Sequence, residues 1–333
     1  MRLFLTGSTG FIGQPLTRAL LRRGWEVTAL VRRPAAPEAR ALAAAGVRLV
    51  PGDIVDSDRA ALKAALEGHD LVFHNAGWYE FGLSRRAHAR MRAVNVQGAD
   101  TILGLAVEAG VPRIVYTSST IAIGDTGGAL ADESSARRGK PISFYEVSKT
   151  EAHAVAERYQ ERGAPLVIVS PAQVIGPGDH APFGWFARLY VRGLFPAMSW
   201  APDAVFTMIH VDDVAEAMAL AAERGQPGRT YFLGGTSITM RQIMDIWRAA
   251  PGGLKPRLWL PRPLAWSSAL LAEPLLRLLR LPAFFSRETV TNAFGRYRYS
   301  SARAEQELGA RFRSAEQAWR DTLAAERAAL RRA

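Results

Sequence analysis

Short apolar runs alternate with longer amphipathic segments along the first half of the chain. The longer segments repeat their apolar positions with a helical period, for example over residues 12–23, 87–109 and 143–162. The short runs are rich in Val, Ile and Phe and predict strands at residues 2–6, 26–31, 47–50, 71–73, 113–117 and 166–170. This alternation predicts βαβ units, and therefore an α/β fold with a doubly wound parallel sheet and right-handed crossovers.

The second half of the chain has a different pattern. After Pro171 the apolar segments are interrupted by Gly and Pro, and short strands are predicted at residues 206–210 and 230–233. Residues 302–333 predict two helices interrupted near Gly309. The sequence contains no repeat and no long linker between independent domains. We therefore expect this half to form a smaller, mixed C-terminal region beside the sheet.

Three glycines follow the first predicted strand. Gly7, Gly10 and Gly13 lie three residues apart, where the strand gives way to a helix. Glycine lets the backbone turn tightly and approach a pyrophosphate, which would then lie at the positive N-terminus of the helix. A tight turn that only packs the helix on the strand is the alternative, but the surrounding βαβ unit favours dinucleotide binding.

Two arginines close the second predicted strand. Arg32 and Arg33 lie about twenty residues past the glycines, where an acidic side chain would bind the ribose 2′-hydroxyl of NAD. Guanidinium groups instead pair with a phosphate, so NADP is predicted over NAD. The alternative is that one or both arginines face solvent. After the third strand, Asp53 would accept a hydrogen bond from the adenine amino group, with Ile54 beside it.

A tyrosine and a lysine are spaced four residues apart in the segment 143–162. On a helix, Tyr145 and Lys149 project from one face, and an ammonium group beside a phenol lowers the pKa of the phenol. A phenol with a pKa near neutrality is a usable general acid or base. A surface pair of the same spacing is the alternative. Ser118 and Ser119 end the fifth strand, where either would donate to a substrate oxygen or simply be a polar strand end.

Further motifs occur in the order typical of extended short-chain dehydrogenases/reductases, and the chain resembles that family over nearly its whole length. Besides the glycine turn and the Tyr-x-x-x-Lys pair, the motifs are His74-Asn75-Ala76-Gly77, Asn95-Val96, Thr117-Ser118-Ser119, Pro171-Ala172-Gln173-Val174-Ile175-Gly176-Pro177-Gly178 and His210-Val211-Asp212-Asp213-Val214-Ala215. The resemblance implies a Rossmann fold and a nicotinamide dinucleotide cofactor. It also implies that Ser119, Tyr145 and Lys149 are the catalytic residues, with Lys149 holding the nicotinamide ribose.

The expected cofactor site follows from these motifs together. Pro171 to Val174 would line the nicotinamide. The predicted cofactor-binding residues are Gly7, Thr9, Gly10, Phe11, Ile12, Arg32, Arg33, Asp53, Ile54, Ala76, Gly77, Asn95, Thr117, Tyr145, Lys149, Pro171 and Val174. The predicted division of the chain is a dinucleotide-binding domain at 1–175 with a returning segment at 205–235, and a substrate-binding region at 176–204 and 236–333.

Two departures indicate the branch of the family. Members that act on nucleotide sugars usually carry an arginine shortly before the His-Val-x-Asp motif, but Phe206 to Ile209 contain no cation. Ser170 also stands where sugar epimerases commonly have arginine. The chain is therefore more similar to the dihydroflavonol 4-reductase and 3β-hydroxysteroid dehydrogenase branch. This branch interconverts a ketone and a secondary alcohol by hydride transfer. The alternatives are a nucleotide-sugar epimerase or dehydratase and, less favoured, a cofactor-sensing protein without turnover.

Aromatic residues supply a candidate substrate pocket. Some must be ordinary core, but two groups follow the fourth strand and the Gly-Pro turn, so a cleft lined by rings is expected for a hydrophobic, cyclic or aromatic substrate. The predicted pocket residues are Trp78, Tyr79, Ser119, Phe183, Trp185 and Phe186. Tyr190 and Trp200 are weaker candidates. No metal site is predicted, because the six histidines lack ligand spacing and cysteine is absent.

The net charge of +11 needs a separate explanation. Only four of the 42 basic residues are lysines, and no nucleic-acid-binding motif accompanies the charge, so a nucleic-acid partner is not predicted. The segment 254–298 holds eight basic and two acidic residues, and within it 258–281 is strongly apolar. Its prolines leave no transmembrane span. A substrate lid or a packed helix is the favoured interpretation, with membrane-surface contact or a partner interface as alternatives.

The remaining expectations concern location and assembly. The first residues already form a predicted strand and lack the basic region and cleavage site of a secretory signal, so a cytoplasmic protein is expected, peripheral to a membrane if 258–281 binds one. In many relatives the helices corresponding to 87–109 and 143–162 pair across a two-fold axis, so the resemblance implies a homodimer.

Overall fold

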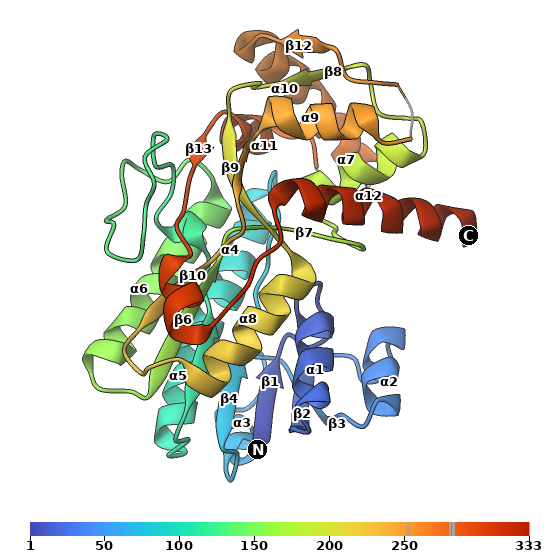
Figure 1. Ribbon diagram of the computed structural model, residues 1–333. Helices are drawn as coiled ribbons and strands as arrows, with labels where there is room; N and C mark the ends of the chain where they lie inside the picture. Colours follow the sequence, from blue (N-terminus) through green and yellow to red (C-terminus); the bar gives the residue numbers. More distant parts are fainter. Residues whose placement is uncertain (252–253, 280, 282–283, 333) are drawn as a thin grey trace.

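A parallel sheet forms the centre of the computed structural model, which describes residues 1–251, 254–279, 281 and 284–332 (Figure 1). Its seven strands are β1 (Arg2–Thr6), β2 (Glu26–Val31), β3 (Arg48–Pro51), β4 (Leu71–His74), β5 (Ile114–Thr117), β6 (Leu166–Pro171) and β10 (Thr230–Leu233). Their spatial order is β10-β6-β5-β4-β1-β2-β3. The predicted strands are confirmed to within one residue at each end.

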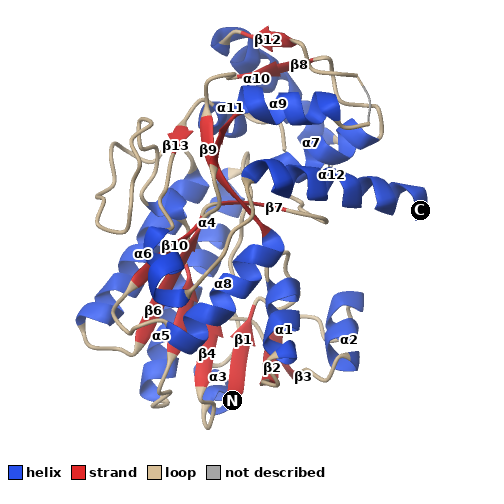
Figure 2. Ribbon diagram, viewed as in Figure 1, coloured by secondary structure: helices blue, strands red, loops and turns tan. Residues whose placement is uncertain are grey.

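Helices cover both faces of this sheet, which confirms the doubly wound prediction (Figure 2). One face carries α1 (Gly13–Arg22), α2 (Pro37–Ala44) and α8 (Val211–Arg224); the other carries α3 (Arg59–Leu66), α5 (Gly98–Glu108) and α6 (Phe144–Glu161). The strand order runs outward in both directions from β1 and β4. In sheets of this kind a crevice opens at the carboxyl ends of the strands where the order reverses.

The helix predicted at 87–109 consists of three elements in the structure. They are α4 (Arg85–Arg92), a π-helical turn η1 (Ala93–Gln97) and α5. The path stays helical, but the π turn carries Asn95, whose side chain bonds the backbone of Trp78 and the hydroxyl of Ser148. Such a turn changes the local rise without changing the apolar spacing much, so the sequence pattern does not reveal it.

The C-terminal region is smaller and mixed, as expected. Its main sheet combines parallel and antiparallel pairs of β7 (Gln173–Ile175), β9 (Val205–His210), β11 (Ser237–Thr239) and β13 (Arg296–Tyr297). A second, parallel pair is formed by β8 (Met198–Trp200) and β12 (Leu258–Leu260). The helices of this region are α7 (Pro182–Val191), α9 (Met240–Ala249), α10 (Arg262–Leu278), α11 (Arg287–Ala293) and α12 (Ala315–Arg332).

Short helical turns complete the structure. A 3₁₀ turn, η2 (Thr120–Ala122), follows β5, and a second π-helical turn, η3 (Ala304–Leu308), precedes α12. Gly309, with φ +72°, lies between η3 and α12. This confirms the interruption predicted near this residue. The segment 205–235 is divided between the sheets: β9 belongs to the small sheet, whereas α8 and β10 belong to the large one.

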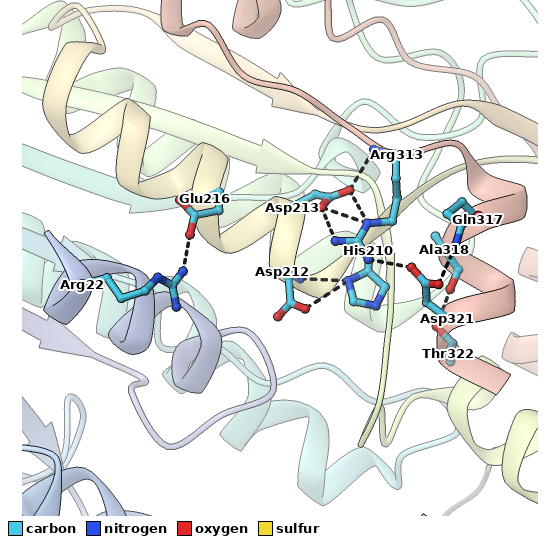
Figure 3. A network of polar contacts seen from close by, with 10 residues as sticks. All are labelled: Arg22, His210, Asp212, Asp213, Glu216, Arg313, Gln317, Ala318, Asp321 and Thr322. Carbon is cyan, nitrogen blue, oxygen red and sulfur yellow. Dashed lines mark hydrogen bonds and ion pairs between the residues drawn. The ribbon is translucent and has the colours of Figure 1, made fainter. Parts of the chain in front are cut away.

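One arginine connects the two regions. Arg313 precedes α12 and binds Asp213, in the first turn of α8, through its side chain at 2.7 Å and its backbone N–H at 2.9 Å (Figure 3). A third bond, at 2.8 Å, joins Arg313 to Asp321 of α12. Beside it, His210 caps α8 by accepting the N–H of Asp212 at 3.2 Å. This network holds α12 against the start of α8.

Replacing Arg313 tests the strength of this connection. We expect Arg313→Met to lower the free energy of unfolding by about 1–3 kcal/mol, because Asp213 is mostly buried and would keep no cationic partner. Urea denaturation measures the loss. The control is Arg320→Met, which removes an exposed pair with Glu316 and should cost at most about 0.5 kcal/mol. Equal losses in the two variants would contradict the structural role of Arg313.

Candidate functional site

A cavity of about 1000 Å³ opens at the carboxyl edge of the large sheet and extends into the C-terminal region. It is lined by every residue predicted to bind the cofactor except Arg33, and by all six residues predicted for the substrate pocket. The cavity therefore brings together predicted site residues that lie far apart in the sequence, from Gly7 to Phe186. Arg33 is exposed and faces an adjoining hollow with Gln14 and Arg18.

The three glycines of the turn have different surroundings. Two of them are packed against backbone atoms, and the third faces the cavity. Gly7 has φ +75°, and a Cβ there would lie 2.7 Å from the backbone nitrogen of Ala76, so only glycine fits between the ends of β1 and β4. A Cβ on Gly13 would collide with the carbonyl of Gly7. A Cβ on Gly10 would meet only that carbonyl, at 3.3 Å, and Gly10 is exposed on the cavity wall beside the N-terminus of α1. Gly10 is therefore where a phosphate can approach the backbone.

The far end of the cofactor half is charged. Asp53 lies between two arginines, with its carboxylate 4.0 Å from Nε of Arg32 and 3.7 Å from Arg90. The side chain of Arg32 is 72% exposed and lines the cavity. Arg90, from α4, was not predicted; it also forms a two-pronged pair with Asp56. Nothing local distinguishes Arg90 from other arginines of this chain, so only the fold could place it here.

The three predicted catalytic residues come from two neighbouring elements. Tyr145 and Lys149 lie on the first turns of α6, which begins where the hydroxyl of Ser143 accepts the N–H of Glu146 at 3.2 Å. Ser119 follows β5 and caps η2. The alternative donor, Ser118, is buried and bonds His153 at 2.8 Å. Both serines line the cavity, but the hydroxyl of Ser119 makes only long contacts, donating to the Pro171 carbonyl at 3.4 Å and accepting the N–H of Ile121 at 3.3 Å, so Ser119 is the better placed to bond a substrate.

Burial, rather than the lysine, determines the pKa of the tyrosine. Burial raises the pKa of Tyr145 well above its usual value, and the neighbouring hydroxyl of Ser119 partly offsets this. Lys149 is itself buried, and its ammonium donates to the carbonyl of Thr117 at 3.2 Å. Burial lowers the pKa of Lys149 to about 8. The predicted lowering of the tyrosine pKa by Lys149 is thus wrong for this structure, because removal of the phenol from water dominates the shift.

Asn95 orients the site through its neighbours. Its carboxamide oxygen accepts the N–H of Trp78 at 2.7 Å, and its nitrogen donates to the Trp78 carbonyl and to Ser148, both at 2.9 Å. Ser148 in turn donates to the carbonyl of Tyr145 at 2.8 Å. Asn95 lines the cofactor half, but its polar atoms are engaged by the protein. It therefore couples the loop after β4 to the helix that carries Tyr145.

The substrate half of the cavity has aromatic and thioether walls. Phe183, Trp185 and Phe186 enter it from α7, and the ring of Tyr79 lies 4.6 Å from that of Tyr145. Tyr190, by contrast, is core, fully buried and bonded to the carbonyl of Trp247. Trp200, the other weaker candidate, does line the cavity. Further wall residues that the sequence pattern did not single out for this pocket are Phe195, Phe206, Met240, Met244, Trp247, Asn292, Tyr297 and Tyr299.

One buried acid also lines this half. Asp179 accepts the N–H of Ala181 at 2.8 Å through one oxygen, and its other oxygen has no partner among the described residues. Burial raises the pKa of Asp179 to about 6. It was not predicted, since an acid before a proline and a helix is normally a cap. Among the residues that the structure describes, no group of three His, Asp or Glu side chains is placed to hold a metal ion.

The cofactor half fits a nicotinamide dinucleotide. Gly10 and the N-terminus of α1 are open to a pyrophosphate, Asp53 and Ile54 stand at one end, and Pro171 and Val174 stand at the other, next to Lys149. All of these positions line the same cavity. The residues present thus match the group that the glycine turn predicts.

Comparison with known proteins identifies the family. The sequence profile of the "NAD dependent epimerase/dehydratase family" matches residues 3–234. The "Putative dihydroflavonol 4-reductase" of Synechocystis is 34% identical, over 96% of this chain and 93% of its own length. A "4-hydroxy-2-methyl-3-oxo-4-farnesyl-3,4-dihydroquinoline-1-oxide ketoreductase" of Stigmatella aurantiaca is 31% identical, over 84% of this chain and 82% of its own.

A solved structure extends the likeness to the whole fold. The dTDP-glucose 4,6-dehydratase DesIV of Streptomyces venezuelae, with NAD bound, is 26% identical with a TM-score of 0.73, and 98% of this chain and 97% of that chain are covered. The profile match and the two reductase relatives confirm the predicted resemblance and an NAD(P)-dependent oxidoreductase. The chain therefore belongs to the NAD dependent epimerase/dehydratase family, the extended short-chain dehydrogenases/reductases.

Proposed function

We propose that this protein is an NADP-dependent reductase that interconverts a ketone and a secondary alcohol on a hydrophobic, cyclic or aromatic substrate. The observation that carries the proposal is the wall of the substrate half. Rings and thioethers surround the space in front of Tyr145 and Ser119, and apart from Lys149 the lysine and arginine residues among the described lining are Arg32 and Arg90, which lie beside Asp53. Such a space suits an apolar ligand with one polar group.

The same observation disfavours a nucleotide sugar. A diphosphate is normally held by cations, yet β9 presents Phe206 and Thr207 to the cavity, and no arginine precedes His210 on this strand. Solved nucleotide-sugar enzymes such as DesIV share the fold, so the fold alone does not identify the substrate. Two of the relatives that match most of the chain are a putative dihydroflavonol 4-reductase and a ketoreductase whose substrate name contains a farnesyl group, which supports an apolar ketone.

Each catalytic side chain has a distinct part in the reaction. A bound nicotinamide dinucleotide would supply the hydride for reduction and accept it for oxidation. Tyr145 is protonated at neutral pH because burial raises its pKa, so it donates a proton to the ketone oxygen. Ser119 donates a hydrogen bond that orients this oxygen. The ammonium of Lys149, held at the Thr117 carbonyl, stabilises the negative charge that develops on the phenol.

The proposed preference for NADP rests on the charged end of the cofactor half. Arg32 and Arg90 flank Asp53, and the exposed guanidinium of Arg32 can turn toward a 2′-phosphate. Arg33 lies in the adjoining hollow and adds positive charge near this end of the cavity. NAD remains the alternative, since Asp53 offers a carboxylate in the same place and DesIV binds NAD.

Removal of the phenol hydroxyl tests the reaction. We expect Tyr145→Phe to lower kcat for ketone reduction by about 100-fold to 10,000-fold, because the proton donor is lost. NADPH binding, followed by fluorescence, should stay unchanged. The control is Tyr159→Phe, on the same helix, whose hydroxyl bonds Asp100 outside the cavity. Full turnover in Tyr145→Phe would exclude this assignment.

The buried ammonium group predicts a pH dependence of stability. Between pH 8 and about 10.5 the unfolded chain binds a proton at Lys149 that the folded chain does not, so the free energy of unfolding rises with pH in this window. Below pH 8 the cost of burying the charge is fully present. We therefore expect Lys149→Met to stabilise the protein at pH 7 by about 1–3 kcal/mol, while abolishing turnover.

Urea denaturation at pH 7 and pH 10 measures both effects of the lysine. As the pH rises from 7 to 10, Lys149 should increase the free energy of unfolding of the native protein. The Lys149→Met variant should not show this increase. Lys63→Met is the control, since Lys63 forms an exposed pair with Glu67. A destabilised Lys149→Met variant at pH 7 would show that its bond to Thr117 matters more than its desolvation.

Cofactor preference depends on Arg32 if the proposal is right. We expect Arg32→Ser to raise the Kd for NADPH about tenfold and to change the Kd for NADH much less, because a charge-assisted bond to the 2′-phosphate is lost. Fluorescence titration with both nucleotides gives the two constants, and Arg48→Ser, outside the cavity, serves as the control. Tighter binding of NADH than NADPH by the native protein would contradict the preference.

A further inference from the structure

The strongest unexplained feature outside the cavity is a helix whose apolar side faces outward. In α10 the buried positions are Ala265, Ala269 and Glu273, four residues apart. Leu264, Leu271, Leu275 and Leu278 follow intervals of seven, four and three residues, so they share the opposite face, and all are exposed. A helix that packs on a core normally buries its large apolar residues and exposes its polar ones. Here that arrangement is reversed.

Neighbouring elements carry further exposed apolar residues. Leu258 of β12 pairs with Met198 of β8, and both side chains are exposed. In Figure 1, α10, β12 and β8 lie together at the opposite end of the molecule from the N-terminus. We call this area the leucine surface. Its exposed members are Leu194, Met198, Leu254, Leu258, Leu264, Trp266, Leu270, Leu271, Leu275, Leu278, Leu279 and Leu281.

The unpaired charges around the leucine surface have one sign. Arg192, Lys255, Arg257 and Arg262 are exposed, and none of them forms an ion pair within the described parts of the chain. The acids nearby are matched by arginines: Glu273 is buried between two of them, Asp203 pairs with Arg241, which lies over Trp259 of β12, and Asp245 pairs with Arg248. The rim therefore carries an excess of cations, which is the pattern that attracts an anionic surface.

We propose that the leucine surface docks the protein on an anionic lipid bilayer. The arginines and Lys255 would lie at the headgroups, and the leucines of the outward face would enter the acyl boundary. A second copy of the chain is a poorer occupant, because a two-fold contact would set the same unpaired cations against each other. No helix in the described ranges is long and apolar enough to cross a membrane, so α10 would lie in the plane of the surface.

The position of this surface connects it to the cavity. The chain leaving α10 places Phe284 against Trp185 and Phe285 against Trp200, with ring centroids 5.2 Å apart in both pairs. Trp185 and Trp200 line the substrate half, as do Thr289, Asn292 and Ala293 of α11, the next helix. A lipophilic ketone dissolved in the bilayer would thus enter near its site of reduction. This delivery rests on the proposed function, whereas the docking does not.

Vesicle sedimentation of the purified full-length chain tests the docking. We expect binding to phosphatidylcholine vesicles that contain 30% phosphatidylglycerol to be at least about tenfold stronger than to phosphatidylcholine alone, and to weaken as salt is raised. The triple variant Leu271→Ser, Leu275→Ser, Leu278→Ser should lose at least about tenfold in binding. The matched control replaces three exposed apolar residues elsewhere, Val107→Ser, Leu130→Ser and Leu330→Ser, and should bind like the native protein.

Three outcomes would overturn the docking proposal. They are no sedimentation of the native protein with anionic vesicles, equal sedimentation of the two triple variants, and a native dimer in solution that the α10 variant alone converts to a monomer without any vesicle binding. NADPH binding checks that each variant is folded. Reduction of small water-soluble ketones without vesicles tests the proposed function separately: turnover without sedimentation defeats only the docking, and sedimentation without turnover defeats only the reductase assignment.

Discussion

The close contact between the ends of β1 and β4 is the constraint on which the rest of the site depends. The backbone of Gly7 passes so near Ala76 that no side chain fits between them. The hydroxyl of Thr6 completes the junction by bonding His74 at 2.7 Å and the N–H of Ala76 at 3.1 Å. Because the chain order reverses between these two strands, their contact determines both where the crevice opens and where α1 begins.

The reactive end of the crevice is built from groups that lose hydration. Burial keeps the phenol of Tyr145 protonated, lowers the pKa of Lys149 to about 8 and lowers that of His74 to about 3. The neutral imidazole of His74 can therefore serve the Thr6 junction without adding charge beside Lys149. A site of this kind sacrifices stability to hold a cation where negative charge develops during reaction. The carbonyl of Thr117 and the network around Asn95 keep these groups in place.

The C-terminal region gives the crevice its second wall and its surroundings. Arg313 joins α8 to α12, and the small sheet carries Phe206 and Tyr297 to the cavity. This region buries a separate aromatic cluster rather than extending the core of the large sheet. Its apolar residues are therefore divided between that cluster, the substrate half of the cavity and the outward face of α10. Lys255, Arg257 and Arg262 belong to the same stretch of chain as the last of these, and the proposed membrane docking rests on that combination.

Local sequence was sufficient to predict the large sheet and the motifs at its carboxyl edge. Strands β1 to β6, the glycine turn and the Tyr145 and Lys149 pair are defined by short-range periodicity and spacing, which depend on neighbouring residues alone. The π turn at Asn95, the arrival of Arg90 beside Asp53 and the wall residues from Met240 to Tyr299 were decided only by the tertiary structure. The same holds for the pKa of Tyr145 and the outward face of α10. Spacing along a helix shows that residues share a face, but only packing shows which face is buried, and burial determines both the charge of a phenol and the exposure of a leucine.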